Sequence, residues 1–438
     1  MPNVSFETWW YAVPFSHLPP LEFMPSLLLL VCFVPIVAMR YNGSTCVGKE
    51  TRIIVIVIVI IVIIIIIIVI IVIIIIVIVI VIVIVIILRV CLLKMFDVFL
   101  ALNARWRVEL GKLALRGVPP RMVMLCALVV LAGLVDHHSP LDAVEFFAGK
   151  MAITLGLQYR DFNCYAVELL QDKGAGVQDI MTPQGFAFAL SLVLRTVPGG
   201  MNWWGIVCST WIWLCRSTTG RSETNVLGNW RKRRNVRVGN EMLARVIALM
   251  MVGCARGVLN ILEQPDSSIM PLAPRFQQWI AAFAVFVTKV RLGFFGGASE
   301  KPVKLFSTDP CVREVPRNPP RSWAPKDGGL WKKYKNEDGE TKLDGDTNLK
   351  PSQEYPLLFG WAVARMYARN RPRLVATANM QASNTADADA VEALYEALQL
   401  QRDCDQWEDA NLEPVVELLC SMIDQRFPSP PLSIAIIV

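Results

Sequence analysis

The first residues in this sequence whose types and spacing could do chemistry are two glycines and a glutamate. Gly149 and Gly156 follow the mostly apolar run 144–147, and Glu168 directly follows a second apolar run, 164–167. A glycine turn lets a ligand approach the backbone, and a carboxylate at the end of the next strand can accept hydrogen bonds from ribose hydroxyls. This spacing predicts a nucleoside site in which Glu168 binds the ribose. The alternative interpretation is that the glycines only permit a tight turn and close helix packing.

These side chains must be positioned by strands and helices that alternate along the chain. From Asp142 onward, short apolar segments of strand length are separated by segments with helical periodicity. This alternation is typical of a Rossmann-like α/β fold, in which helices cover both faces of a mostly parallel sheet. The carboxyl ends of such strands meet at one edge of the sheet, where ligands of these folds bind.

Several short motifs follow one another in a recognisable order. They are Phe147-Ala148-Gly149, then Gly156-Leu157, Asp179-Ile180, Cys208 after an apolar strand, and Leu262-Glu263-Gln264-Pro265. In this order they resemble motifs of the cytosine-5 DNA methyltransferases, which have the class I S-adenosylmethionine-dependent methyltransferase fold. The similarity extends over roughly residues 142–305.

The resemblance implies S-adenosylmethionine as cofactor and assigns roles to individual residues. The residues that would bind the cofactor are Phe147, Gly149, Gly156, Glu168, Asp179 and Ile180. Asp179 and Ile180 would lie beside the adenine. Cys208 would attack the target base as a thiolate, and the Glu263 carboxylate would hold that base. The methyl acceptor would be a nucleic acid or a protein.

The motifs are degenerate. Met151 and Ala152 stand where the family has paired glycines. Val207 replaces the proline before the cysteine, and Gln264 replaces an asparagine. No target-recognition domain is evident in the sequence. These departures favour a second interpretation, in which the domain is a non-catalytic scaffold or binding domain.

A run of isoleucine and valine from Ile53 to Ile87 dominates the N-terminal third of the chain. It contains no polar side chain and exceeds the roughly 20 residues that a helix needs to cross a membrane. In lipid, a lone segment satisfies its backbone only as a helix. The run therefore predicts a single-pass membrane protein in contact with the lipid bilayer. Because isoleucine and valine codons differ by one base, the run also fits a translated nucleotide repeat, and the protein would then be soluble.

The basic residues around this run predict its orientation. Three precede it and six follow it closely: Arg40, Lys49 and Arg52 before, and Arg89, Lys94, Arg105, Arg107, Lys112 and Arg116 after. Basic residues concentrate on the cytosolic side of membrane spans, so we expect the C-terminal body to be cytosolic.

These patterns divide the chain into six segments. We expect a non-cytosolic N-terminal segment at 1–52, a transmembrane helix at 53–88, and a basic juxtamembrane and helical segment at 89–141. After these we expect a methyltransferase-like α/β domain at 142–312. The chain should then continue as a disordered, Pro-rich, charged linker at 313–354 and a C-terminal helical segment at 355–438. The 11 cysteines form no C-x-x-C pair and the chain has only 3 histidines, so we expect no metal site.

Three further groups of residues allow either a structural or a binding role. The tryptophans at 203, 204, 211 and 213 favour a core position, although indoles can also stack on bases. Arg231 to Arg234 fits a solvated basic turn or a contact with anionic lipid, and the polar loop 216–221 fits a phosphate contact or simple solvation.

Overall fold

The computed structural model describes the chain in ten ranges. They are residues 56–79, 100–136, 139–169, 175–297, 299–316, 331–335, 339, 341–345, 354–400 and 405–426. The chain divides into two compact units, residues 1–88 and residues 89–438.

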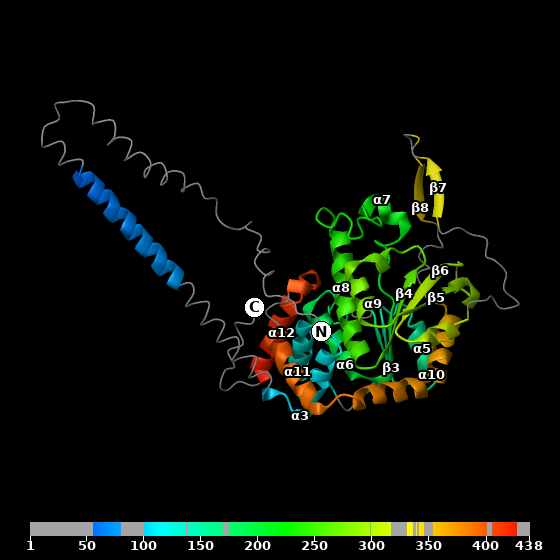
Figure 1. The fold of residues 1–438 in the computed structure, drawn as a ribbon. Helices are drawn as coiled ribbons and strands as arrows, with labels where there is room; N and C mark the ends of the chain where they lie inside the picture. The colour runs from blue at the N-terminus through cyan, green and yellow to red at the C-terminus, as the bar shows by residue number, and fades with distance from the viewer. Residues whose placement is uncertain are drawn as a thin grey trace, which may run out of the picture. The chain divides into compact units, whose positions relative to one another are not determined.

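The described part of the first unit is one helix, Ile56–Val79 (blue in Figure 1), which is 24 residues long. None of its isoleucine and valine side chains is buried. At 1.5 Å per residue its length is about 36 Å, which suffices to cross the hydrocarbon core of a bilayer. An apolar helix within the predicted span 53–88 is therefore confirmed. The rest of that span and the predicted segment 1–52 lie outside the described residues.

The second unit is built on a six-stranded sheet. Its strands are β1 Leu141–Phe146, β2 Cys164–Val167, β3 Thr196–Trp204, β4 Leu259–Pro265, β5 Phe286–Arg291 and β6 Pro302–Ser307. The order is β2-β1-β3-β4-β6-β5. The first four strands are parallel to one another, whereas β6 is antiparallel to both β4 and β5. The predicted α/β class and the mostly parallel sheet are confirmed.

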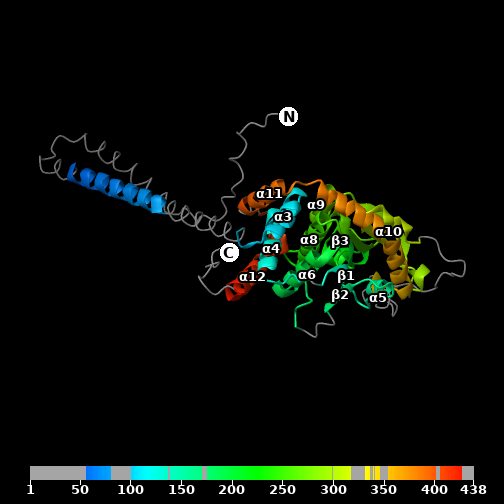
Figure 2. The ribbon, with the colours of Figure 1, turned by 90° about the horizontal axis from the view of Figure 1, so that it is seen from below.

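Helices cover both faces of this sheet, as the alternation of its side chains requires. Trp203 and Trp204 are both fully buried but belong to different hydrophobic clusters, one on each face. On one face lie α5 (Ala152–Gln158) and α10 (Leu357–Ser383), with Phe359 of α10 packed edge-on against Trp203. On the other face lie α6 (Pro183–Arg195), α8 (Arg234–Ala255) and α9 (Pro274–Ala282) (Figure 2).

A further helical layer packs against the helices of the second face. It consists of α3 (Ala104–Leu115), α4 (Pro120–Leu131), α11 (Asp387–Leu400) and α12 (Glu413–Arg426). The described parts of the segments expected at 89–141 and 355–438 thus belong to the same compact unit as the sheet. α8 is also long and apolar enough to cross a membrane, but two thirds of its apolar window is buried, and it is a core helix of this unit.

One part of the predicted disordered linker has regular structure. Strands β7 (Trp331–Lys335) and β8 (Thr341–Gly345) pair antiparallel within 313–354. Residues 317–330 and 346–353 lie outside the described residues.

Candidate functional site

The order of the parallel strands creates one switch point. The chain leaves β1 through α5 to reach β2 on one side, and then returns through α6 to β3 on the other side of β1. In open α/β sheets, ligands bind outside the carboxyl ends of the strands at such a point. The residues that follow β1, β2, β3 and β4 are therefore the candidate site.

The structure brings the predicted residues Gly149 and Glu168 together at this edge. The Gly149 backbone N–H donates a 2.6 Å hydrogen bond to Glu168 Oε2. The Glu168 backbone N–H in turn donates to Gln178 Oε1 at 2.8 Å. Gly149 has a φ of +54°, and no other residue lies within 4 Å of the place that a Cβ would occupy. A ligand could thus approach the backbone of this turn, next to a half-buried carboxylate.

The loop from β1 to α5 holds two more residues with left-handed backbone conformations. Phe147 has a φ of +60° and Met151 a φ of +58°. Each left-handed non-glycine residue costs about 1–2 kcal/mol. Met151, which stands where the methyltransferases have a glycine, thus adopts a conformation that glycine would adopt without strain. Strained backbone of this kind tends to cluster at functional sites.

Glu145 is a buried carboxyl within β1 that is not among the site residues predicted from the sequence. It is 1% exposed and accepts hydrogen bonds from the backbone N–H groups of Ile153 and Thr154 and from Thr154 Oγ1, the last two at 2.7 Å. It thereby satisfies backbone donors in the first turn of α5. Burial, with a smaller contribution from the charge of Glu168, raises the pKa of Glu145 to about 7 despite these hydrogen bonds.

We expect Glu145→Gln to change the pH dependence of stability. The pKa of Glu145 is about 7 in the folded state, against an ordinary value of 4.5, so the folded state binds more protons than the unfolded state between these values. The stabilisation is fully present below pH 4.5 and is lost as pH rises through about 7. It amounts to on the order of 3 kcal/mol, at 1.4 kcal/mol per pKa unit.

Urea unfolding of the full chain in neutral detergent, followed by tryptophan fluorescence across this pH window, measures the effect. The parent should lose this stability with rising pH, and Glu145→Gln should not. Glu392→Gln, a change on α11, serves as the control and should behave like the parent. Parallel pH profiles for the parent and Glu145→Gln would contradict the expectation.

Glu263 lies at the same edge, near the end of β4, and is 5% exposed. Its Oε2 accepts a 2.9 Å hydrogen bond from the Tyr355 hydroxyl, while its buried Oε1 has no hydrogen-bond partner among the residues that the structure describes. Burial and the Glu263 carboxylate raise the pKa of Tyr355 well above its ordinary value. Tyr355 also packs edge-on against Trp203.

Tyr355 belongs to a short segment that closes over the strand ends. A Cβ on Gly205, the residue after β3, would lie 2.9 Å from the Tyr355 hydroxyl and 3.2 Å from the Phe147 carbonyl oxygen. The preceding residue, Glu354, forms a 2.6 Å salt bridge with Lys150 in the β1–α5 loop. The segment immediately before α10 therefore contacts three of the four strand ends that form the site, those of β1, β3 and β4.

Cys208, the predicted nucleophile, is half-buried in the loop after β3. Burial raises the pKa of its thiol to about 11, with an opposing effect from Lys301 and a further increase from Glu263. The thiol is thus protonated at neutral pH in this conformation, whereas a nucleophilic cysteine needs a lowered pKa.

The remaining predicted residues lie around the site or away from it. Asp179 precedes α6, and its Oδ1 accepts a hydrogen bond from the Met181 backbone N–H. Ile180 is buried in the core, and its carbonyl accepts from Arg245. Gly156 lies inside α5, where a Cβ would come within 2.7 Å of the backbone of Gly360 in α10. Gly156 thus serves close helix packing in this structure.

The sequence contains a signal for one of the two missed residues. Glu145 is a charged residue flanked by apolar residues in a strand, and such residues are rarely buried without a partner. Tyr355 has no comparable signal, because it is 92 residues from Glu263 and lies in the range expected to be helical packing. In the described ranges, His, Cys, Asp and Glu side chains form no group of three that could hold a metal ion.

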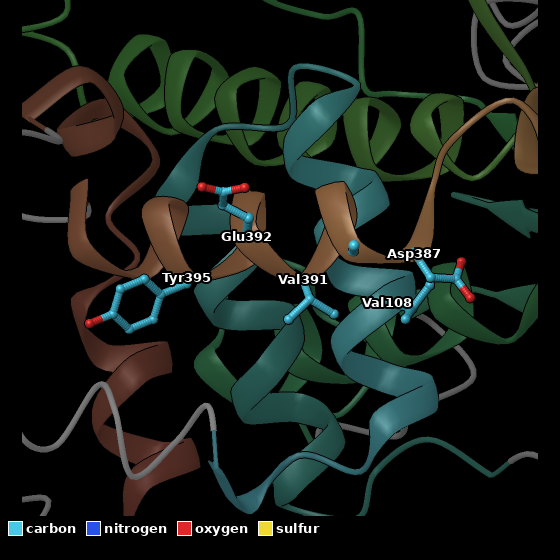
Figure 3. A pocket seen from close by; sticks show the side chains of 6 residues that line it. Val108, Asp387, Val391, Glu392 and Tyr395 are labelled. Carbon is cyan, nitrogen blue, oxygen red and sulfur yellow. The ribbon is translucent and has the colours of Figure 1, made fainter.

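A shallow, apolar hollow of about 610 Å³ lies between α3 and α11 (Figure 3). It is lined by Val108, Asp387, Ala388, Val391, Glu392 and Tyr395. None of the predicted site residues contributes to it, and we assign it no chemistry.

The chain matches no protein-family model, no curated protein sequence and no solved structure. The geometry of the site is therefore what supports a function.

Proposed function

We propose that this is a membrane-anchored protein whose body binds S-adenosylmethionine at the carboxyl ends of β1 and β2 and transfers a methyl group to an acceptor not yet identified. The anchor is the span that contains Ile56–Val79, in a single pass with the body on the cytosolic side. The contact between the Gly149 backbone and the Glu168 carboxylate is the observation that supports cofactor binding most directly.

The order of the strands supports a Rossmann-like interpretation. The doubly wound dinucleotide-binding sheet has the order 3-2-1-4-5-6. The neighbouring strands β2, β1, β3 and β4 of this protein correspond in position to strands 2, 1, 4 and 5 of that sheet. No strand is described between β2 and α6, where the outer strand of that sheet would occur.

The residues at the edge of the sheet fit the nucleoside part of this cofactor. The turn at Gly149 is open on the side where a Cβ would project, and the Glu168 carboxylate beside it can accept hydrogen bonds from two ribose hydroxyls. When bound, the cofactor would supply an electrophilic methyl group. The Oε1 of Glu263, which has no hydrogen-bond partner within the described ranges, is a buried acceptor at the same edge for a polar group of the methyl acceptor.

Two observations favour a second candidate function, a non-catalytic methyltransferase-like scaffold or binding domain. The Tyr355 hydroxyl occupies one oxygen of Glu263, and burial raises the pKa of Cys208 to about 11. Both features are unfavourable for a reaction that begins with a cysteine thiolate.

Isothermal titration of the full chain in neutral detergent with S-adenosylmethionine tests the proposal, with adenosine triphosphate as the control ligand. We expect heat of binding for S-adenosylmethionine and none for the nucleotide. The absence of heat and of any thermal shift at millimolar cofactor would rule out the cofactor. Binding without transfer of a labelled methyl group to DNA, RNA or protein would favour the scaffold.

A further inference from the structure

The segment 207–240, which follows β3 and includes the start of α8, contains an unusual concentration of positive charge. It holds seven arginine and lysine residues and one acidic residue, Glu223, a net charge of +6 that equals the formal net charge of the whole chain. Five of these cations are exposed: Arg231, Lys232, Arg233, Arg234 and Arg237. In the part of the chain that the structure describes, none of the five forms an ion pair. We call this surface, residues 231–237, the basic turn.

The basic turn includes the first turn of α8, and the N-terminus of this helix adds to the positive potential of the surface. The N-cap residue Arg233 makes no side-chain capping hydrogen bond, and the first turn contains no acidic residue. The N-terminus of a helix carries a partial positive charge, so basic residues there raise the local potential, and an anion relieves the repulsion.

A buried arginine holds this region in place. Arg221, 2% exposed, donates hydrogen bonds to the Val226 carbonyl oxygen, Thr210 Oγ1 and Asn240 Oδ1, and its guanidinium lies 3.4 Å from the centre of the Trp211 ring. These contacts tie the loop after α7 (Arg216–Thr219) to α8, and Figure 1 shows α7 beside one end of α8. The partners described for Arg221 are all neutral, so its charge is not compensated within the loop.

Exposed indoles accompany the charge. Trp230 is 41% exposed, and the Arg231 guanidinium lies 5.2 Å from the centre of its ring. Trp213, in the same segment, is 42% exposed. Indole faces stack on unpaired bases, and guanidinium groups pair with phosphates in a bidentate manner. The exposed apolar residues of the segment, at positions 207, 213, 227 and 230, are spread along it rather than gathered on one face of an amphipathic helix, which disfavours insertion into a lipid surface.

We propose that the basic turn, together with Trp230, binds single-stranded nucleic acid through its phosphates and its unpaired bases. Since the segment follows the carboxyl end of β3, the bound strand would lie next to the candidate site. Binding does not require S-adenosylmethionine, so it can be tested without the cofactor.

The test uses the full chain in phosphatidylcholine nanodiscs and a fluorescein-labelled oligodeoxythymidylate of about 20 nucleotides, which exceeds the roughly 4–16 nucleotides that single-strand binding modules cover. Fluorescence anisotropy measures binding between about 50 and 200 mM salt. The variant Arg231→Gln/Arg233→Gln/Arg234→Gln should bind about tenfold more weakly or worse, and its salt slope should fall by about 2, at roughly 0.7 per phosphate contact. Trp230→Ala should bind about tenfold more weakly because one stacked base is lost.

Matched controls separate this surface from net charge and from general loss of an indole. Arg160→Gln/Arg365→Gln/Arg369→Gln removes three exposed arginines elsewhere, and Trp361→Ala removes an indole that is 39% exposed. Both controls should bind within about twofold of the parent, and all variants should keep its thermal unfolding midpoint. Equal losses in the test and control variants would overturn the proposal. So would a parent that binds only duplex, or that co-floats with phosphatidylserine vesicles without binding the oligonucleotide.

Discussion

Replacement of Ile56–Val79 by a serine- and glycine-rich segment of equal length should move the protein from the membrane pellet to the supernatant after alkaline carbonate extraction. The helix has 24 residues, all isoleucine or valine, and none is buried within the protein. Transfer of these side chains into hydrocarbon is favourable by on the order of tens of kcal/mol, at about 25 cal/mol per Å². No effect expected elsewhere in this protein is as large.

The control replaces the same residues with leucine, which keeps length and apolar character and should keep the protein in the pellet. Release of the parent by carbonate would show that this helix does not anchor it. A glycosylation site engineered near Gly339, between β7 and β8, reports the orientation. This site should remain unmodified if the body is cytosolic, as the basic residues that flank the isoleucine and valine run predict.

Glu168→Ala should weaken binding of S-adenosylmethionine by about 1.5–3 kcal/mol, because it removes a charge-assisted hydrogen-bond acceptor for the ribose. The substitution also removes the acceptor of the Gly149 N–H, which helps to order the turn. Folding should survive, because Glu168 lies at the end of β2 and is only half-buried.

Gly149→Val should abolish that binding. Gly149 has a φ of +54°, which a β-branched residue strongly disfavours, and the added side chain would fill the open space beside the turn. Isothermal titration of both variants, with Glu392→Ala on α11 as a matched acidic control, measures the two effects. If both variants bind the cofactor as the parent does, the cofactor site is elsewhere or absent.

The pairing of Gly149 with Glu168 could be predicted because both residues follow strands. Neighbouring parallel strands end at the same edge of a sheet, and β1 and β2 are neighbours, with Phe146 opposite Val167. The same reasoning places Glu263 at that edge. Local patterns thus sufficed to locate one edge of the sheet and the acidic residues along it.

The role of Gly156 illustrates where local patterns fail. The spacing of Gly149 and Gly156 fits a cofactor loop, but the structure places Gly156 against the backbone of Gly360 in α10, a helix that comes much later in the sequence. A glycine that permits close helix packing and a glycine that admits a ligand look alike in sequence, because both simply lack a side chain.

The sequence by itself determined the apolar span and the α/β class, because a run without polar side chains and an alternation of strands and helices are properties of neighbouring residues. Only the tertiary structure decided that Tyr355 meets Glu263, that Glu145 is buried with a raised pKa, and that Arg221 is enclosed among neutral partners. These features depend on which surfaces pack together across long stretches of chain. The burial that packing creates, rather than residue type or spacing, sets the charge and the hydrogen-bond partners of each group.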